Sequence, residues 1–434
     1  MDLDRLFPLA GYSVKSDKVP EDESKPINVF LERSESRQML CHVCGTPMNQ
    51  VKDFQRCKVR DLPILNRGTT VIFRRLKGWC DECRKVRLEA CDFISKATPH
   101  LTARHAYWLH RLCEIAPVAA VSRLVGASKM TLWRADLELL EKAFENYFIP
   151  DVTHLSCDEV YAQAYHDEKA DETRDDRFFT IITDLNTRKV IWVERSRRKE
   201  ALDKFFKRLG VNRCSKIQIV ATDEHEGYAS SIAQFCPNAT HVLDRFHLVK
   251  NFEEAINETR KLLYKMLPQK EVRKLGGGKY RYLFLKKADR RTDKEQAHMA
   301  KVMKDNEAFY RLELIKERML TIFDQPSAAE ARKVFDEIRD WIWEAGFPPL
   351  KAWWNHIEGK WKLFSNYFEF PFTSAVSEGI NNVIKALKRR CFGFSNLNYF
   401  RLKILQVCGF LNSKYRSPTG QWTTEAKLLM GMTK

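Results

Sequence analysis

The chain has 434 residues, 44% of them hydrophobic and 30% charged, which excludes an intrinsically disordered protein and allows more than one domain. Its 74 Lys and Arg exceed its 57 Asp and Glu by 17, a surplus that favours a polyanionic partner. No stretch approaches the roughly 18 apolar residues of a membrane span, and the first residues lack the basic-then-apolar order of a signal peptide. We therefore expect a nucleic-acid-binding protein of the cytoplasm with no membrane partner; a merely soluble basic protein is the alternative.

Residues 1–40 mix Asp, Glu, Ser and Lys without a clear period. This composition predicts an N-terminal arm that is poorly ordered by itself. The apolar side chains at its start would either dock on a partner surface or belong to a frayed terminus. They are those of Leu3, Leu6, Phe7 and Leu9.

Two Cys-x-x-Cys pairs predict a zinc ribbon over residues 41–97, because each pair places two thiolates on one side of a turn and two pairs complete a tetrahedron. The four ligands would be Cys41, Cys44, Cys80 and Cys83. A site with four thiolates has no open position, so we expect one structural Zn²⁺ rather than a catalytic one. The spacing between the pairs is longer than the commonest zinc pattern, and unrelated reduced thiols are the alternative. Cys57 and Cys91 are expected to take no part.

Residues 98–148 have a helical period, and a turn at Gly126 separates two helices with the spacing of a helix-turn-helix DNA-binding domain. Ser128 is expected to cap the second helix. Any helical hairpin has this spacing, so the prediction of DNA binding also depends on the charge and on the neighbouring zinc module. The side chains predicted to face the DNA groove are Lys129, Thr131 and Arg134. Those predicted to be core are Val121, Leu124, Leu132 and Trp133.

The period changes to that of strands after residue 150. A first strand is predicted in the apolar run that ends at Asp158, and a hairpin of two strands over residues 178–194. A helix, a fourth strand ending at Asp223, a short helix and a last strand before Asp244 follow. This order is that of an RNase H-like fold, an α/β fold with a mixed sheet and helices on its faces. We predict the first part of this core at residues 149–250 and the second part, with C-terminal helices, at residues 366–434.

Residues 251–365 are mostly helical and strongly charged, which predicts an α-helical insertion in the core. A Gly-rich loop at residues 275–279 interrupts it. Tryptophans at helical spacing are usually core residues; the alternative is that one of these rings stacks on an extruded base. They are Trp341, Trp343, Trp353, Trp354 and Trp361.

Three carboxylates stand where divalent metal ions can use them. Asp158 and Asp223 are near the ends of the first and fourth strands, which lie side by side and parallel in this fold, and Glu378 is on a late basic helix. Carboxylates brought together repel one another, and bound cations relieve that repulsion. Two Mg²⁺ (or Mn²⁺) ions would activate a water or a 3′-hydroxyl and stabilise the leaving oxygen of an in-line displacement.

The helix that carries Glu378 has an apolar face, with Ile380, Ile384 and Leu387 at spacings of three and four residues. Its other face is predicted to contact the phosphate backbone; a solvated charged face is the alternative. These polar side chains are Asn381, Asn382, Lys385, Lys388 and Arg389.

Three side chains that follow the last strand are predicted to assist at the cleft. Arg245 would meet a phosphate, His247 would assist proton transfer or hold the scissile strand, and Asp244 would lie beside them. A hydrogen-bonded strand end is the alternative. Weaker supporting candidates are Glu159, Glu224, His225 and Glu226.

Taken in order, these motifs resemble the ISL-three (ISL3) family of bacterial insertion-sequence transposases, from Cys41 to about Phe410. The matching segments are the two cysteine pairs, Cys157-Asp158-Glu159, Thr222-Asp223 with Tyr228, Asp244-Arg-Phe-His247 and Ser377-Glu-Gly-Ile-Asn381. The resemblance implies a DDE transposase with an RNase H-like core, and Asp158, Asp223 and Glu378 as its metal-binding catalytic triad. The segments Cys391-Phe-Gly and His225-Glu226 depart from the family pattern, but neither departure removes an acid.

The resemblance also implies double-stranded DNA partners, both the terminal inverted repeats and the target DNA, read by the zinc ribbon and the helix-turn-helix. It implies homodimers or larger assemblies on paired ends, associated with the bacterial nucleoid. Two alternatives remain: a catalytically silent DNA-binding regulator, against which the intact acid triad argues, and a nuclease that cuts without joining, against which the two DNA-binding modules argue.

Overall fold

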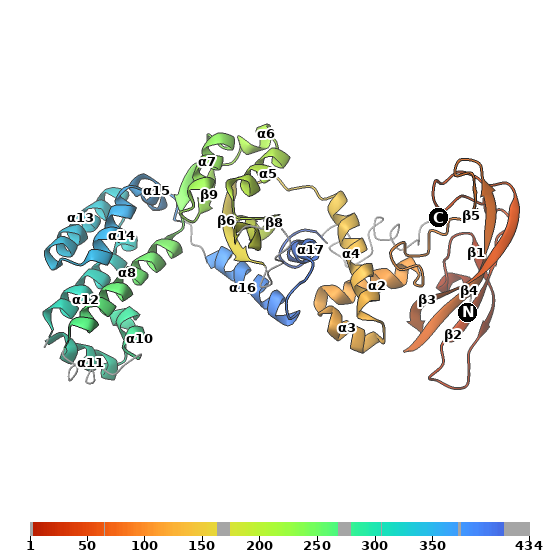
Figure 1. Ribbon diagram of the computed structural model, residues 1–434, viewed down its shortest axis with the longest axis horizontal. Coiled ribbons are helices and arrows are strands. Elements are labelled where there is room, and N and C mark those ends of the chain that lie inside the picture. Colours follow the sequence, from red (N-terminus) through yellow and green to blue (C-terminus); the bar gives the residue numbers. More distant parts are fainter. Residues whose placement is uncertain are drawn as a thin grey trace. The chain divides into compact units, whose positions relative to one another are not determined.

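The computed structural model describes residues 3–64, 66–162, 174–267, 279–304, 306–371 and 375–411. The chain divides into two compact units, one formed by residues 1–149 and 383–434 and the other by residues 150–382. Figure 1 colours both units along the sequence. Among the described helices, none combines the length and the apolar character needed to cross a membrane.

The first unit begins with a five-stranded sheet. The order is β1-β2-β4-β3, with β5 paired to the free part of β4; β2 and β4 are parallel and the other neighbours are antiparallel. The strands are β1 (Tyr12–Lys18), β2 (Ile27–Arg33), β3 (Val51–Ile64), β4 (Arg67–Cys80) and β5 (Lys85–Leu88), preceded by helix α1 (Leu3–Leu6).

The N-terminal segment is part of this sheet, which corrects the expectation of a loose arm. Residues 27–31 of β2 alternate, with Ile27, Val29 and Leu31 buried on one face as the period of a strand requires. Phe7 and Leu9 are also buried in the same core. The apolar start therefore packs on its own chain, because the long β3–β4 hairpin offers β2 a partner strand that local composition cannot reveal.

Three helices follow: α2 (Ala103–Ile115), α3 (Val118–Val125) and α4 (Lys129–Glu145). The predicted cap is confirmed, because the Ser128 hydroxyl accepts the Thr131 N–H at 3.1 Å. Leu132 and Val121 are buried and Trp133 is half-buried. The prediction for Leu124 was wrong: it is 75% exposed, because the core contacts of this short helix come from Val121 and its valine neighbours on one stripe.

A buried polar network joins these helices to α17 (Leu397–Cys408), which follows α16 (Ala375–Arg390) in the chain. Asp136 on α4 is fully buried. Its carboxylate lies 2.6 Å from His110 Nδ1 and 3.3 Å from Lys403 Nζ. It also accepts a hydrogen bond from the Tyr399 hydroxyl. Because every charged member has a partner, the network holds α2, α4 and α17 together.

The second unit contains a mixed five-stranded sheet with the order β10-β9-β6-β7-β8. The β6–β7 and β7–β8 pairs are antiparallel, whereas β6–β9 and β9–β10 are parallel. The predicted hairpin and the parallel neighbourhood of the first and fourth strands are therefore confirmed. The strands are β6 (His154–Tyr161), β7 (Phe178–Asp184), β8 (Lys189–Arg195), β9 (Ile219–Thr222) and β10 (Thr240–Leu243). Three helices accompany them: α5 (Lys199–Leu209), α6 (Val211–Cys214) and α7 (Glu226–Phe235).

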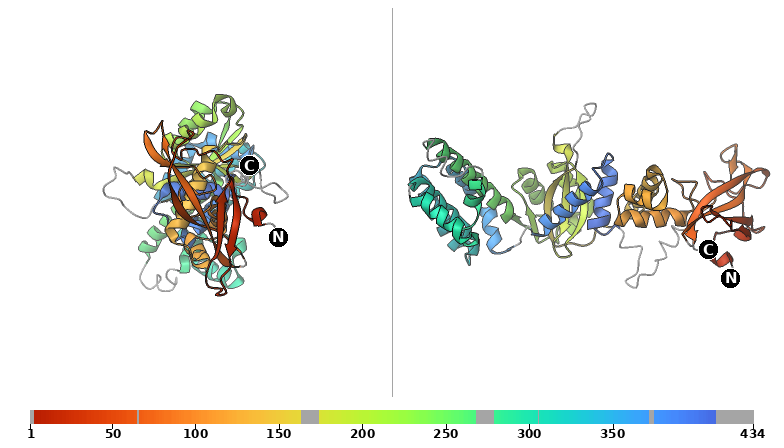
Figure 2. Two further views of the ribbon diagram at one scale, coloured as in Figure 1. Left: turned by 90° about the vertical axis from the view of Figure 1, so that its right-hand side faces the viewer. Right: turned by 90° about the horizontal axis from the view of Figure 1, so that it is seen from below.

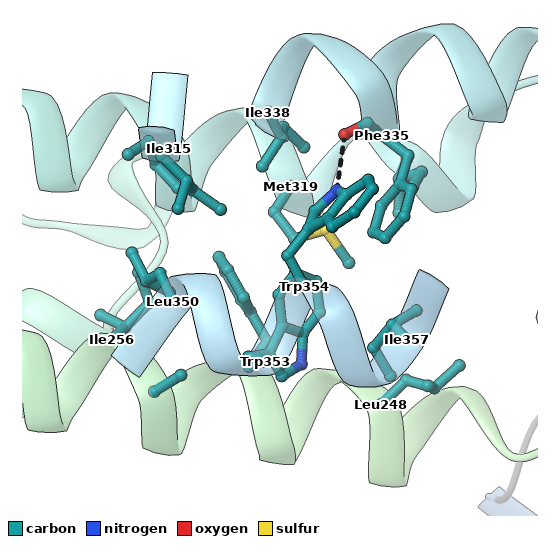
Figure 3. Close-up of a cluster of buried hydrophobic side chains, with 14 of the residues drawn as sticks. Leu248, Ile256, Ile315, Met319, Phe335, Ile338, Leu350, Trp353, Trp354 and Ile357 are labelled. Atoms are coloured by element: carbon teal, nitrogen blue, oxygen red, sulfur yellow. Dashed lines mark hydrogen bonds between the residues drawn. The ribbon is translucent and has the colours of Figure 1, made fainter. Parts of the chain in front are cut away.

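The segment after β10 is helical, and its green and teal helices pack on one another in Figure 2. Its Trp353 and Trp354 are buried, and Trp354 Nε1 donates to the Phe335 carbonyl at 3.2 Å (Figure 3). The core prediction is thus confirmed for these two rings, while Trp343 is 41% exposed. Gly276–Gly278 lie outside the described residues. The helices are α8 (Arg245–Met266), α10 (Lys279–Leu285), α11 (Asp293–Lys304), α12 (Glu307–Leu320), α13 (Ala328–Ala345), α14 (Pro348–Glu358) and α15 (Trp361–Ser365).

Candidate active site

Three aspartates follow one row of the second sheet. Thr222 on β9 is paired with Cys157 on β6 and with Leu243 on β10. The next residue of each strand is an aspartate, namely Asp158, Asp223 and Asp244. Since all three strands run in the same direction, the three carboxylates line one cleft, together with His247 and Ser377. The enclosed space of about 20 Å³ admits a water-sized group rather than an organic ligand.

Helix α16 contacts this cleft through two side chains one turn apart. The Ser377 hydroxyl lies 2.7 Å from that of Ser156 on β6, and Asn381 Nδ2 donates to Asp158 Oδ2 at 2.6 Å. Both α16 side chains are buried and continue the stripe of Ile384. The serine pair was not predicted, and Asn381 had been grouped with the DNA-binding residues. The signal in the sequence was the spacing of 377, 381 and 384, which puts polar residues on the buried stripe.

Glu378 follows Ser377 on the same helix turn, and its side chain is exposed. In the described residues, only the four cysteines form a group of three or more ligand side chains whose atoms all lie within 4.8 Å of one another. The three predicted acids are therefore spaced more widely than that. What the structure brings directly together is Asp158, Asp223 and the helix face next to Glu378.

The Asp158 carboxyl has a raised pKa. Burial is the largest cause and the neighbouring Asp223 charge adds to it, while the Glu159 N–H, His247 and Asn381 oppose the shift. His247 Nε2 lies 4.0 Å from Asp158 Oδ1 and 3.7 Å from Asp244 Oδ2. Burial and mutual repulsion destabilise the ionised form of these acids, and a bound cation would relieve both effects.

Glu159 lies on the opposite face of β6, because successive strand residues alternate. Its Oε1 atom accepts a hydrogen bond from the Tyr228 hydroxyl, with 3.1 Å between the two oxygens, and its Oε2 atom lies 3.8 Å from Arg197 Nη1. Burial, followed by the Asp223 charge, raises the pKa of Glu159 to about 7. Tyr228 is fully buried and also contacts Thr180 at 3.0 Å, so this network supports β6 from beneath the cleft.

The helical segment after β10 holds the loop that carries Asp223. Glu224, the next residue, accepts from Asn251 Nδ2 at 3.1 Å and lies 2.5 Å from His356 Nε2 and 3.5 Å from Lys360 Nζ. These partners belong to α8, to α14 and to the residue that precedes α15. His225 donates its N–H to Asp223 Oδ1 at 3.1 Å, which fixes the turn after the strand.

Arg245 is held by the same helical segment. Its Nη1 donates to the Tyr367 hydroxyl at 3.2 Å, and its guanidinium lies 4.4 Å from the centre of the Phe323 ring. In this structure Arg245 therefore connects the end of β10 with the helices after it. Asp244 accepts the Phe246 N–H at 3.0 Å and caps α8, so it has a structural task besides facing the cleft.

A family model for DDE transposases of the ISL3 type, described as "Transposase", matches residues 167–404, more than half of the chain. The chain belongs to the ISL3 family of transposases. Asp223 and Glu378 lie inside the matched range, and Asp158 lies shortly before it.

Two curated relatives extend the similarity. This ISL3-family transposase is 25% identical over 395 residues to the transposase for insertion sequence element IS1001 of Bordetella parapertussis, which covers 91% of this chain and 94% of that one. It is 23% identical over 314 residues to the transposase for insertion sequence element IS1557 of Mycobacterium tuberculosis, which covers 66% of each chain. Both relatives carry the name of a transposase, which agrees with the family assignment.

The cysteine cluster of this transposase is compatible with structural zinc. The Sγ atoms of Cys41 and Cys83 are 3.9 Å apart, and those of Cys44 lie 3.4 Å from Cys80 and 3.6 Å from Cys83. Zinc–sulfur bonds of about 2.3 Å in a tetrahedron give edges of about 3.8 Å. The Val43 and Cys83 N–H groups also donate to thiol sulfurs at 3.4 Å, as second partners of metal-bound thiolates do.

The predicted DNA contacts have different degrees of exposure. On α4, Lys129 and Arg134 are exposed, whereas Thr131 is half-buried and contacts Ser128 and His100 through its hydroxyl. On α16, Lys385 and Arg389 are exposed. Lys388 is half-buried, and burial lowers the pKa of its ammonium group.

Proposed function

We propose that this chain is the transposase of a bacterial insertion sequence that binds the terminal inverted repeats of its element and catalyses metal-dependent DNA strand cleavage and strand transfer. One observation carries the proposal. Asp158 and Asp223 follow a paired row of adjacent parallel strands, and the helix that carries Glu378 is hydrogen-bonded to Asp158 through Asn381. Family membership supports the same activity.

The second unit is proposed to be an RNase H-like core. In support, its first three strands form an antiparallel meander, and its fourth and fifth strands are parallel to the first on the other side, in the order β8-β7-β6-β9-β10. The helices from residue 245 on follow the fifth strand, where the insertion was predicted. The boundaries proposed from the sequence are ribbon 41–97, helix-turn-helix 98–148, core 149–250 and 366–434, and insertion 251–365. Two of them are amended: the ribbon's sheet also includes β1 and β2, and α17 packs with the helix-turn-helix segment in the first unit.

The residues of the cleft suit Mg²⁺ or Mn²⁺, because carboxylates are hard oxygen donors and the raised pKa of Asp158 records a cost that a cation removes. When bound, two such ions supply an activated nucleophile and stabilise the leaving oxygen. Asp158 and Asp223 would hold the ions, with Glu378 from the adjoining helix turn. Asn381 orients the Asp158 carboxylate, and His247 is placed to exchange a proton beside Asp244.

DNA would be bound by the first unit. The proposal rests on the cysteine cluster, on the exposed Lys129 and Arg134 of α4, on the exposed Lys385 and Arg389 of α16, and on the net charge of +17. Exposed cations of this kind neutralise phosphates and release counterions. We further propose that pairing of two DNA ends requires a homodimer or a larger assembly, and that the target is double-stranded DNA.

The deciding experiment incubates the full chain with duplexes that carry the terminal sequences of its element, in Mg²⁺, and resolves nicks and joints on a denaturing gel. Asp158→Asn, Asp223→Asn and Glu378→Gln should each reduce cleavage at least 100-fold and leave end affinity within twofold. The exposed Glu344→Gln on α13 is the control. Nicks without joined products would indicate a nuclease that cuts without joining. Binding without nicks would indicate a catalytically silent DNA-binding regulator. Wild-type cleavage by Glu378→Gln would remove that residue from the triad.

A further inference from the structure

A second, larger pocket lies in the first unit, away from the aspartates. Its volume is about 550 Å³, and it lies between helices α2 to α4 and the segment that joins α16 to α17. We name it the Trp133 pocket. The apolar side chains that line it include Pro117, Met130, Trp133, Phe392, Phe394 and Tyr399. Its volume is in the range of small-molecule sites, and aromatic rings on several sides suit a flat ligand.

Phe392 stands at the edge of this pocket in an unusual conformation. It follows the end of α16, is 98% exposed, and has a φ of 55°, in the left-handed region that non-glycine residues rarely adopt. The backbone there is fixed: Phe392 N–H donates to the Arg389 carbonyl at 3.0 Å, and Gly393 N–H donates to the Lys388 carbonyl at 2.9 Å. These bonds form a left-handed cap at the end of α16, a position that is usually Gly, and here the cap holds an aromatic ring out in solvent.

The turn that displays Phe392 is anchored on its far side. Phe394 stacks on Phe400 of α17 with ring centres 4.4 Å apart and planes 10° apart. Within the pocket, the Trp133 ring meets the Tyr399 ring edge-on at 6.3 Å and is only half-buried, so part of its surface remains open. The pocket therefore combines one protruding ring with an accessible ring held in place by its neighbours.

The charges around the pocket favour an anion. Of the lining acids and bases, Glu114 is paired with Arg111, and Lys403 is paired with Asp136. Lys129 and Arg390 are exposed, and within the described residues neither forms a salt bridge to an acid. Arg390 Nη2 donates to the Ile115 carbonyl at 2.9 Å, which holds the guanidinium at the pocket while its other N–H groups stay available.

We propose that the Trp133 pocket receives one nucleobase unstacked from a DNA strand, with Phe392 inserted in the gap that the base leaves. Trp133 stacks on the extruded base, and Lys129 and Arg390 contact the phosphates on either side of it. An apolar wedge lowers the cost of unstacking, and aromatic rings and cations repay it with stacking and phosphate contacts. The inference rests on the proposed function, because it requires that the chain binds the DNA ends.

The test uses the full-length chain and end-bearing duplexes with 2-aminopurine at each terminal and flanking position in turn, since the fluorescence of this base rises when it leaves the stack. Wild type should raise the signal at one position or two adjacent ones. Phe392→Ala should abolish most of that rise, and Phe392→Leu should retain part of it. Because Phe392 is almost fully exposed, the alanine variant should fold normally. Phe54→Ala, an exposed ring on β3, is the matched control.

A second measurement excludes a change in fluorescence without base extrusion. The second duplex has an abasic site opposite the position at which the 2-aminopurine signal rises. The base at that position has no pairing partner, so no base pair must be broken to extrude it. Wild type should bind this duplex at least fivefold more tightly than the matched duplex. Trp133→Ala should lose this preference, and Phe54→Ala should keep it.

Three results would overturn the proposal. Wild type that binds and cleaves ends without unstacking any base would overturn it and leave the proposed function standing. A wild-type rise in fluorescence with Phe392→Ala, together with a wild-type preference for the abasic duplex with Trp133→Ala, would also overturn it and leave the proposed function standing. A chain that neither binds nor cleaves its ends would overturn both.

Discussion

Asn381 of helix α16 donates a hydrogen bond of 2.6 Å to the Asp158 carboxylate on strand β6, two residues that lie 223 positions apart in the chain. The Ser377–Ser156 contact one helix turn earlier fixes the same two elements. Because Glu378 lies between these contacts in the sequence, its helix turn is held beside the strand that carries Asp158. This pair of contacts is how a residue after the long helical segment reaches the first strand of the sheet.

Removal of the Asn381 amide should therefore impair chemistry more than binding. Asn381→Ala leaves Asp158 without one of its partners, and we expect single-turnover cleavage of prebound end DNA to fall about 10- to 100-fold, the range of lost support to a metal ligand. The Mg²⁺ concentration for half-maximal cleavage should rise. Asn382→Ala, at the exposed neighbouring position, removes no contact with Asp158 and should leave the cleavage rate of prebound DNA and its Mg²⁺ requirement unchanged. Equal losses in the two variants would contradict a specific role for Asn381.

Glu224 is predicted to position the Asp223 loop. Glu224→Ala removes the contacts with Asn251, His356 and Lys360, so the turn after β9 loses its attachment to the helices. We expect the cleavage rate to fall roughly 10-fold and the Mg²⁺ requirement to rise, by analogy with lost second partners of metal ligands. His356→Ala should reproduce a smaller part of the loss. Glu344→Ala, which breaks an exposed ion pair with Arg311, is the control. An unchanged Mg²⁺ requirement would speak against positioning.

The cysteine cluster should hold one equivalent of zinc. Cys80→Ser replaces a buried thiolate, so purified protein should lose that zinc and the first sheet should become sensitive to protease, because structural zinc contributes directly to folding. Chelation of wild type should have the same effect. Cys57→Ser, on the same sheet but outside the cluster, should retain its zinc. Zinc content measured by atomic emission decides the matter, and full occupancy in Cys80→Ser would rule out this site.

The Asp136 network should make stability depend on pH in acid. Burial would raise the pKa of Asp136, but Lys403, His110 and Tyr399 outweigh burial and lower the pKa to about 2. A carboxyl whose pKa is lower when folded stabilises above its ordinary pKa, near 4, and the stabilisation is lost as the pH falls towards 2. We expect the stability difference between wild type and Asp136→Asn to shrink by about 2 kcal/mol between pH 5 and pH 2.

Urea denaturation followed by the fluorescence of a reporter attached near α17 measures that difference. The exposed Glu145→Gln on the same helix should show no such dependence. A constant difference between wild type and Asp136→Asn across this pH range would mean that the acid is not held by its partners. At neutral pH, Asp136→Asn should be strongly destabilised, because Lys403 is then left buried without its counter-charge.

The sequence by itself determined the features that depend on neighbours along the chain. The apolar runs on either side of a turn predicted β7 and β8, and the helical spacing of apolar residues predicted α5, whose one buried face follows a period of 3.6 residues. Ser128 predicted its cap, and the cysteine pairs predicted their cluster. The order of the elements was enough to place Asp158 beside Asp223, since strand ends in a parallel sheet meet at one edge.

Only the tertiary structure decided the contacts between distant segments. The sequence near Asn381 does not distinguish it from the neighbouring polar residues. Its role follows from β6, which lies against the face of α16 that carries Asn381. Leu124 is solvent-exposed and residues 27–31 are paired because of what packs beside them, not because of their own composition. Glu224 likewise acquires two of its partners, His356 and Lys360, from segments more than a hundred residues further along. Periodicity records which face is buried, whereas the partner on that face is set by packing across the whole unit.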